Sequence, residues 1–226
     1  MLCYGLVVPR PREHDLEHLM DAAEVLAVES GAAAVTVRAL SELTTMSNGA
    51  IYHAFGSRAG LVGRVWLRAA EQFLAVQRDA VDVALTGGDG SYESAVEAVV
   101  AAADAPARFL LERPVRGGFL LTVDRRELLG SDDLPDDLAR ALRGLDGSLA
   151  RLFVELSQAV WQRSDRDAVS VIRDCVVELP TALLLRGKRI PDAAIRERLA
   201  AAVRAVLSLT PTEPSHQSTA SRKDPS

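Results

Sequence analysis

The chain has 226 residues, of which 48% are hydrophobic and 25% are charged, and its formal net charge is −5 at pH 7. This length can bury one large core or two modest ones. Charges interrupt the apolar runs well short of a membrane span, the first residues lack the features of a secretion signal, and the two distant cysteines make no disulfide framework. We therefore expect a cytoplasmic protein that does not enter the membrane.

The first residues indicate a loose arm followed by a helix. Pro9 and Pro11 argue against helix in residues 1–12. Residues 13–30 have the apolar spacing of a helix, and Gly31 is a typical C-terminal stop.

The stretch from Thr36 to Arg58 has the pattern of two short helices around a tight turn. Thr36 and Ser47 can act as the N-caps of these helices. The expected inward positions are Val37, Leu40 and Leu43 in the first helix and Ile51 and Phe55 in the second. Two short helices around a turn, with small or polar residues outward, are typical of a helix-turn-helix motif, whose second helix enters the DNA major groove.

Residues 36–61, TVRALSELTTMSNGAIYHAFGSRAGL, resemble the DNA-binding signature of the tetracycline-repressor-like (TetR) family of bacterial regulators. The matching positions are Thr36, Val37, Leu40, Ser47, Gly49, Ile51, Tyr52, Phe55, Ser57, Arg58 and Leu61. Thr45 stands where the family usually has a turn glycine, and Ala50 where it usually has threonine. The resemblance implies a homodimeric transcription regulator, most often a repressor, that binds a palindromic operator and responds to a small effector.

Nine residues of the motif are candidate DNA contacts. Those expected to bind phosphates through hydroxyl, imidazole or guanidinium groups are Thr36, Ser47, Tyr52, His53 and Arg58. Those expected to face base edges are Asn48, Gly49 and Ala50, and Arg38 could contact either a base or a phosphate. Two alternatives stay open, since His53 could be an ordinary exposed histidine and Tyr52 could pack against a neighbouring helix.

The surroundings of the motif are acidic. Residues 1–60 hold four arginines against seven aspartates and glutamates, a balance of −3. Non-specific affinity for DNA is almost wholly electrostatic, so we expect it to be weak here. Specific binding would then depend on a few well-placed groups and on two copies of the motif.

The remaining sequence predicts a helical bundle. A helix begins at Ser57 and runs to about residue 84, long enough to join two domains. Residues 91–124 indicate a helix over about 91–103, a turn or kink around Asp104 to Pro106, and then two shorter pieces over 107–112 and 114–124. Leucines at steps of four and three predict a central helix over about 135–162.

A helix over about 165–186, capped by Ser164, is apolar around most of its circumference. Such a helix must be covered on two sides, so one side needs a partner. Pro180 should kink it. Together with a last helix over about 191–209, it lies where members of the resembled family usually dimerise. The expected interface residues are Val169, Ile172, Val176, Leu183, Leu199 and Val203.

A mostly apolar effector pocket is expected within the bundle. Irregular helices around Pro106 and Gly117 can line a cavity, although a distorted core segment would have the same pattern. The candidate lining residues are Phe73, Phe109, Arg116, Phe119, Phe153 and Val176.

Nothing in the sequence indicates catalysis. It has no glycine-rich phosphate loop, no HExxH and no nucleophile elbow. His14 and His18 have the spacing of metal ligands but lack a third ligand, so neither a metal nor another cofactor is expected. Cys175 could be a redox switch, but a small buried apolar residue is the preferred interpretation.

These elements predict an all-α protein of about nine helices in two domains. The expected divisions are an arm (1–12), a three-helix helix-turn-helix domain (13–60), a ligand-binding and dimerisation bundle (61–209) entered by the long fourth helix, and a disordered tail (210–226). The expected function is a non-enzymatic DNA-binding regulator. The alternative is a helix-turn-helix protein whose bundle binds a protein partner instead of a small molecule.

Overall fold

The computed structural model describes residues 13–186, 191–209 and Pro211. All regular elements in these ranges are helices, which confirms the predicted all-α fold. None of the described helices is long and apolar enough to cross a membrane. The arm predicted over 1–12 lies outside the described residues, as does almost all of the tail predicted over 210–226.

The N-terminal part consists of three helices and the start of a long fourth. They are α1 (Glu13–Ser30), α2 (Val37–Leu43), α3 (Asn48–Phe55) and α4 (Arg58–Thr86), with a 3-10 turn, η1 (Ala32–Ala34), after α1. The hydroxyl oxygens of Thr36, Ser47 and Ser57 each accept a hydrogen bond from the backbone amide three residues later. The starts of α2, α3 and α4 are therefore set by local N-caps, as the sequence predicts.

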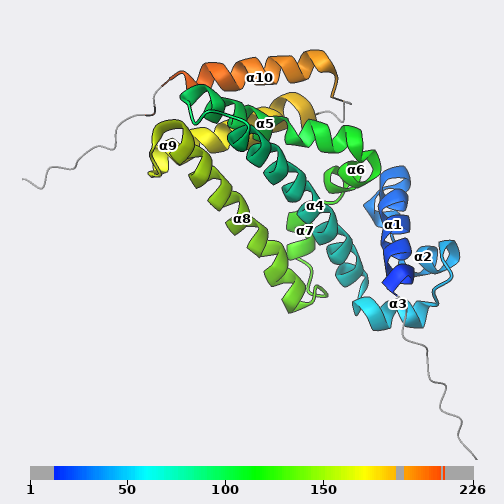
Figure 1. Cartoon of the computed structure of the whole chain (residues 1–226). Helices are drawn as coiled ribbons and strands as arrows, with labels where there is room; N and C mark the ends of the chain where they lie inside the picture. Colours follow the sequence, from blue (N-terminus) through cyan, green and yellow to red (C-terminus); the bar gives the residue numbers. More distant parts are fainter. Residues whose placement is uncertain (1–12, 187–190, 210, 212–226) are drawn as a thin grey trace, which may run out of the picture.

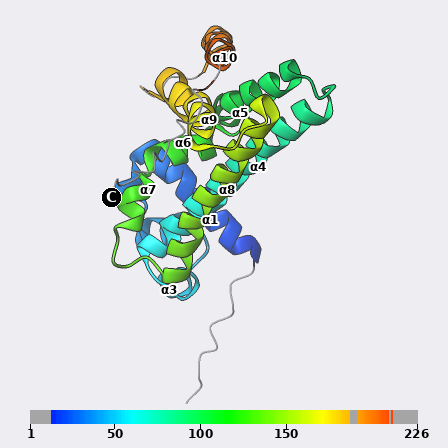
Figure 2. The ribbon, with the colours of Figure 1, turned by 90° about the vertical axis from the view of Figure 1, so that its left-hand side faces the viewer.

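The second part is a bundle that α4 enters from the N-terminal part (Figure 1). Its other helices are α5 (Tyr92–Glu112), α6 (Pro114–Thr122), α7 (Arg125–Leu129), α8 (Asp136–Trp161), α9 (Arg166–Arg173) and α10 (Ala193–Leu207). Two π-helical segments, η2 (Asp174–Glu178) and η3 (Thr181–Leu185), continue α9. Figures 1 and 2 both show α8 along α4, and α10 at the end of the bundle remote from α3.

Two main apolar cores lie at the two ends of α4. The N-terminal core combines α1, α2, α3 and the first half of α4 with Phe119, Val123 and Leu128 from α6 and α7. The bundle core combines the far half of α4 with α5, α8, α10 and the segment from α9 to η3. The N-terminal core thus includes side chains from far beyond the helix-turn-helix motif, so α6 and α7 pack with the N-terminal helices.

The prediction that the helix of residues 91–124 ends near Pro106 is wrong, because α5 continues through this proline to Glu112. Proline has no amide hydrogen and so leaves the carbonyl four residues earlier, that of Ala102, without its helical donor. The side-chain Nε2 of Gln77, on α4, donates to this carbonyl oxygen at 3.0 Å. A tertiary hydrogen bond thus replaces the missing helical one.

The kink predicted at Pro180 takes the form of two widened turns. The amide of Leu179 donates to the carbonyl of Asp174, and that of Arg186 to the carbonyl of Thr181, each five residues back. A proline ring clashes with the carbonyl four residues earlier in a regular α-helix. The π turns on both sides of Pro180 provide room for the ring without ending the helix.

Two local expectations are also wrong. Leu43, expected on the inner side of α2, is 62% exposed. Each three-residue step falls about 60° short of a full helical turn. After two such steps Leu43 therefore lies about 120° around the helix from Val37. The N-cap of α9 is Asp165, not Ser164: its Oδ1 accepts from the amide of Ala168 at 3.2 Å.

The turn between α3 and α4 generates a stability prediction. A Cβ atom on Gly60 would lie 2.1 Å from the backbone oxygen of Phe55, which is too close for any side chain. We expect Gly60→Ala to lower the free energy of unfolding, measured by chemical denaturation, by about 3 kcal/mol. The control Gly144→Ala adds a Cβ in open space on a helix and should stabilise by about 0.5–1 kcal/mol. Equal effects of the two substitutions would contradict the close packing at Gly60.

Candidate nucleic-acid interface

The outward side of α3 carries four of the nine predicted DNA contacts. Ile51 and Phe55 are buried in the N-terminal core, and this orients the opposite side of the short helix outward. The exposed residues on that side are Asn48, Gly49, Tyr52 and His53. Ala50 differs, since it is half-buried and packs against the N-terminal core. Of the three residues expected to face base edges, Asn48 and Gly49 are therefore exposed and Ala50 is half-buried.

The two capping hydroxyls are exposed at the N-termini of α2 and α3. The oxygens of Thr36 and Ser47 accept hydrogen bonds from Ala39 and Ala50 at 3.1 and 3.2 Å. A hydroxyl that accepts one hydrogen bond still has its own proton to donate. The first amides of a helix also favour an anion. Both N-termini can therefore bind phosphate without a basic side chain, which suits an acidic domain.

The two arginines of the motif are already engaged in local interactions. Arg58 donates from Nε to the carbonyl of Val35 and from Nη2 to that of Ala32, both at 2.6 Å, and so fastens the start of α4 to the segment before α2. Arg38 is 86% exposed and pairs with Glu42 at 2.9 Å. An exposed pair of this kind is weak, so the Arg38 side chain can turn to another partner. Arg58, in contrast, holds the motif together.

A charged network joins the N-terminal helices to the bundle. Glu24 on α1 is only 3% exposed, and its carboxylate binds Arg68 of α4 at 2.6 Å and Arg116 of α6 at 2.9 Å. Asp21 accepts from the same two arginines at 2.8 and 2.9 Å, and Glu17 from Arg68 at 2.6 Å. The sequence shows these residues only as separate charges on three helices, and no local pattern indicates that they meet.

A second link joins the bundle to the start of α4. Ser57, the N-cap of α4, donates from its hydroxyl to the carbonyl of Asp133 at 2.7 Å. A Cβ on Gly63 would lie 2.9 Å from side-chain atoms of Leu134 and Leu138, so α4 and the start of α8 approach closely here. The acidic loop before α8 therefore lies against the end of α4 nearest the motif.

The structure does not bring the six predicted pocket residues together. Phe73 and Phe109 pack edge to face, with ring centroids 5.7 Å apart, and line an apolar cavity of about 120 Å³ with residues of α6 and η3. Phe119 lies in the N-terminal core, and Phe153 and Val176 lie in the bundle core. Arg116 is held in the Glu24 network instead, because a half-buried guanidinium needs carboxylate partners.

The predicted interface residues fall into two groups according to their burial. Ile172, Val176, Leu199 and Val203 are buried in the chain's own bundle core and offer no surface to a second copy. The other two, Val169 and Leu183, are half-buried.

The described residues contain no group of three or more His, Cys, Asp or Glu side chains that could hold a metal ion. His14 and His18 are both exposed on α1. Burial raises the pKa of the Cys175 thiol to about 12, so this residue is protonated and unreactive at neutral pH.

Comparison with known proteins agrees with the motif. Residues 19–65 match the model of the family described as bacterial regulatory proteins, tetR family, which confirms the resemblance predicted from the sequence. The TetR-family transcriptional regulator PfmR from Thermus thermophilus has a similar structure, with a TM-score of 0.58 and 19% sequence identity over 84% of this chain and 97% of that one. A putative tetR-family transcription regulator from Shewanella sp. PV-4 gives 0.56 and 16%, over 84% and 95%. No protein of curated function is significantly similar to the chain.

The Glu24 network generates a second prediction. Glu24→Gln removes the buried charge that two arginines share and should lower the free energy of unfolding by about 3 kcal/mol. Glu42→Gln removes a carboxylate from the exposed pair with Arg38 and should cost about 0.5 kcal/mol or less. Chemical denaturation of both variants beside the wild type measures the difference. If the two substitutions cost the same, Glu24 does not hold the helices together.

Proposed function

We propose that the protein, whose residues 19–65 match the model of the tetR-family bacterial regulatory proteins, is a ligand-responsive transcription regulator, a repressor, that binds a palindromic operator as a dimer. The observation that carries the proposal is the exposed polar side of α3, held outward by the buried Ile51 and Phe55. In a dimer, two such helices would bind half-sites about one DNA turn, or a multiple of it, apart.

Within this function the exposed residues of α3 have separate roles. Asn48, beside Gly49 at the start of the helix, would contact base edges, because the absence of a side chain on Gly49 permits close approach. Tyr52 and His53, one turn further along, would bind phosphates, together with the hydroxyls of Thr36 and Ser47. Arg58 would act mainly by fixing the position of the motif, since two of its nitrogens are bound to backbone carbonyls.

This division of roles gives a prediction for DNA binding. Asn48→Ala should relax the base preference at one position of each half-site, where it costs about 1–3 kcal/mol of discrimination. Tyr52→Ala should weaken binding to all sequences alike. Selection from a randomised DNA pool, followed by affinity measurements at fixed salt, separates the two effects. If the Asn48→Ala variant has the same base preference as the wild type, Asn48 does not read a base. If the wild type selects no sequence from the pool, the proposed function is refuted.

The dimer would form through the outer sides of α10 and of the helix from α9 to η3. Val169 and Leu183 retain part of their surface there. The exposed side of α10 carries the small side chains of Ala194, Ala201 and Ala205, with Arg198 beside them. The four predicted interface residues in the bundle core would support this surface from behind.

The interface is tested by a bulky charge on α10. Ala201→Arg should give a monomer by light scattering, because the arginine would block close approach and bring an unpaired charge into the contact. Ala141→Arg, at an exposed position of α8, is the matched control and should leave the dimer intact. A dimer that survives Ala201→Arg would place the contact elsewhere.

The effector would bind in the bundle and act on α4. It must bind the arrangement that cannot hold DNA better than the one that can, because a ligand without differential affinity shifts no equilibrium. The links from α4 to α1 through Glu24, and to α8 through Ser57 and Gly63, are routes by which a change in the bundle would reach α3.

The alternative is that the bundle binds a protein partner. It is favoured by three exposed apolar side chains on α5 and α6, namely Leu111, Val115 and Leu121, and by the small volume of the cavity beside Leu121. Substituting the three by serine should abolish binding of such a partner while operator binding is retained.

A further inference from the structure

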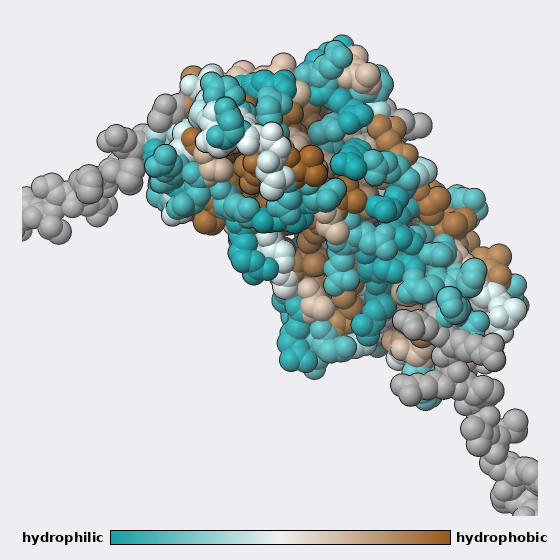
Figure 3. All heavy atoms as spheres, viewed as in Figure 1, coloured by the Kyte–Doolittle hydropathy of each residue, from teal (hydrophilic) through white to brown (hydrophobic). Residues whose placement is uncertain are grey.

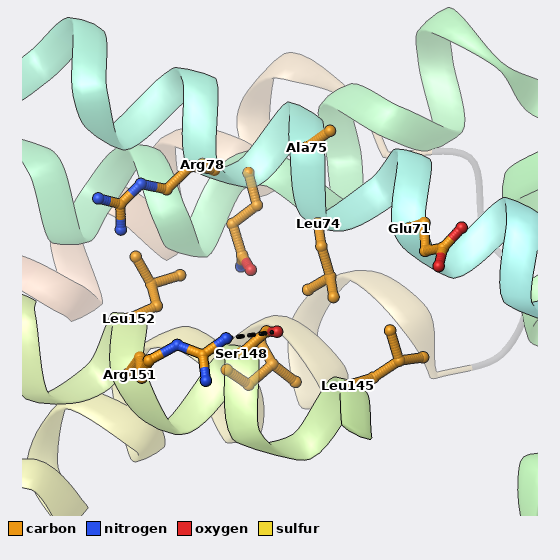
Figure 4. A pocket seen from close by; sticks show the side chains of 10 residues that line it. Glu71, Leu74, Ala75, Arg78, Leu145, Ser148, Arg151 and Leu152 are labelled. Atoms are coloured by element: carbon orange, nitrogen blue, oxygen red, sulfur yellow. Dashed lines mark hydrogen bonds between the residues drawn. The ribbon is translucent and has the colours of Figure 1, made fainter. Parts of the chain in front are cut away.

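A groove runs between α4 and α8 on the face shown in Figure 3, where apolar residues are visible along the line between the two helices. Its volume is about 460 Å³, within the usual range for small-molecule sites. Figure 4 shows Leu74 of α4 opposite Leu145 of α8, and Leu149 and Leu152 continue the apolar lining on α8. The groove is thus a different space from the small cavity beside Phe73 and Phe109.

The side chain of Gln77 lines this groove although it is 1% exposed. Its Nε2 is bound to the carbonyl of Ala102, which Pro106 leaves without a helical donor. Its Oε1 is buried and has no hydrogen-bond partner among the described residues. A buried amide oxygen that accepts no hydrogen bond lowers the stability of the fold, so the lack of a donor to Oε1 requires a physical reason.

The orientation of the Gln77 amide is fixed by the same hydrogen bond. Rotating the amide by 180° would place Oε1 against the oxygen of Ala102, and two acceptors would then face each other. Nε2 must therefore face α5, and Oε1 is the other polar atom of a side chain that lines the groove, left without a donor. A hydrogen-bond donor from outside the chain can satisfy it.

Charges of both signs stand at the ends of the groove. Glu71 lies towards one end, and Arg78 and Arg151 lie towards the other (Figure 4). Arg78 is already paired with Glu155 and Asp82, and Arg151 donates to the Ser148 hydroxyl at 3.0 Å. This arrangement favours neither an anion nor a cation, whereas the middle of the groove offers leucine side chains, the Ser148 hydroxyl and the Gln77 amide.

We propose that the α4–α8 groove binds a neutral amphipathic small molecule, with an apolar body against the leucines and an N–H or O–H group that donates to Oε1 of Gln77. This molecule would be the effector, so the inference rests on the proposed regulatory function. Both walls of the groove lead to the motif: α4 begins beside α3, and the start of α8 packs on Gly63. A ligand that spreads α4 from α8 therefore acts on the helix that positions α3.

The test uses two probes with the same octanoyl chain: octanamide, which donates N–H groups, and N,N-dimethyloctanamide, in which two methyl groups replace the N–H hydrogens. Calorimetry on the full chain without DNA should show about fivefold tighter binding of octanamide, which corresponds to about 1 kcal/mol. The double variant Gln77→Met/Pro106→Ala should lose this preference. Methionine removes Oε1 at similar length, and the new alanine returns the helical donor to the Ala102 carbonyl, so the fold is kept. Pro106→Ala alone is the control and should retain the preference.

A second variant tests whether the probes bind in the groove. Ala75 is exposed at the rim of the groove, and Ala75→Trp should block both probes. The proposal is overturned if neither probe binds, if the wild type binds both equally, if the double variant keeps the preference, or if Ala75→Trp leaves binding unchanged. If octanamide fails to weaken binding to DNA selected from the randomised pool, the groove is not an effector site.

The ligand site in the groove and the function as a DNA-binding regulator can be refuted independently. Selection from the randomised DNA pool uses no probe, and the calorimetry uses no DNA. A chain that selects a DNA sequence but shows no donor preference refutes the groove and leaves the regulator. A chain that shows the donor preference but selects no DNA refutes the regulator, and with it the role of the groove as an effector site.

Discussion

The carboxylate of Glu24 is the group on which the arrangement of the two parts of the chain depends. A carboxylate this deeply buried is tolerated only with cationic partners, and it obtains them from α4 and α6 through Arg68 and Arg116. Three helices from distant parts of the sequence are thereby fixed around one atom group. Because Phe119 of α6 also lies in the N-terminal core, α6 is held with the N-terminal helices by charge and by apolar packing together. Any change in α6 or α4 therefore reaches α1 directly.

The parts of the fold that the sequence predicts correctly are those with local causes. The starts of α2, α3 and α4 follow from hydroxyl N-caps, and the long leucine repeat places α8 to within a residue at each end. Pro106 shows the limit of local rules, because its effect depends on Gln77, a residue 29 positions earlier on another helix. The short helix α7 was also not predicted, and its five residues are too few for an apolar period to show.

The exposed side of α3 could be predicted because a helix-turn-helix is a continuous stretch of sequence, in which the buried positions determine the outward ones. The burial of the candidate pocket and interface residues could not be predicted, because it depends on which side of an apolar helix the chain itself covers. Val176 was a candidate for both and is buried in the bundle core. Gln77 was missed because a single glutamine beside charged residues on a long helix has no sequence signal, and only the freed carbonyl of Ala102 reveals its role.

The widened turns around Pro180 have a geometric consequence for how the bundle closes. The buried positions Ile172, Val176, Pro180 and Leu184 recur every four residues. On a regular α-helix such a stripe would wind around the axis by about 40° per step, and two straight helices would soon lose contact along it. A π turn holds more residues per revolution and takes up part of this winding. The segment can therefore keep one nearly straight seam against its neighbours, so the helices of the bundle need not supercoil.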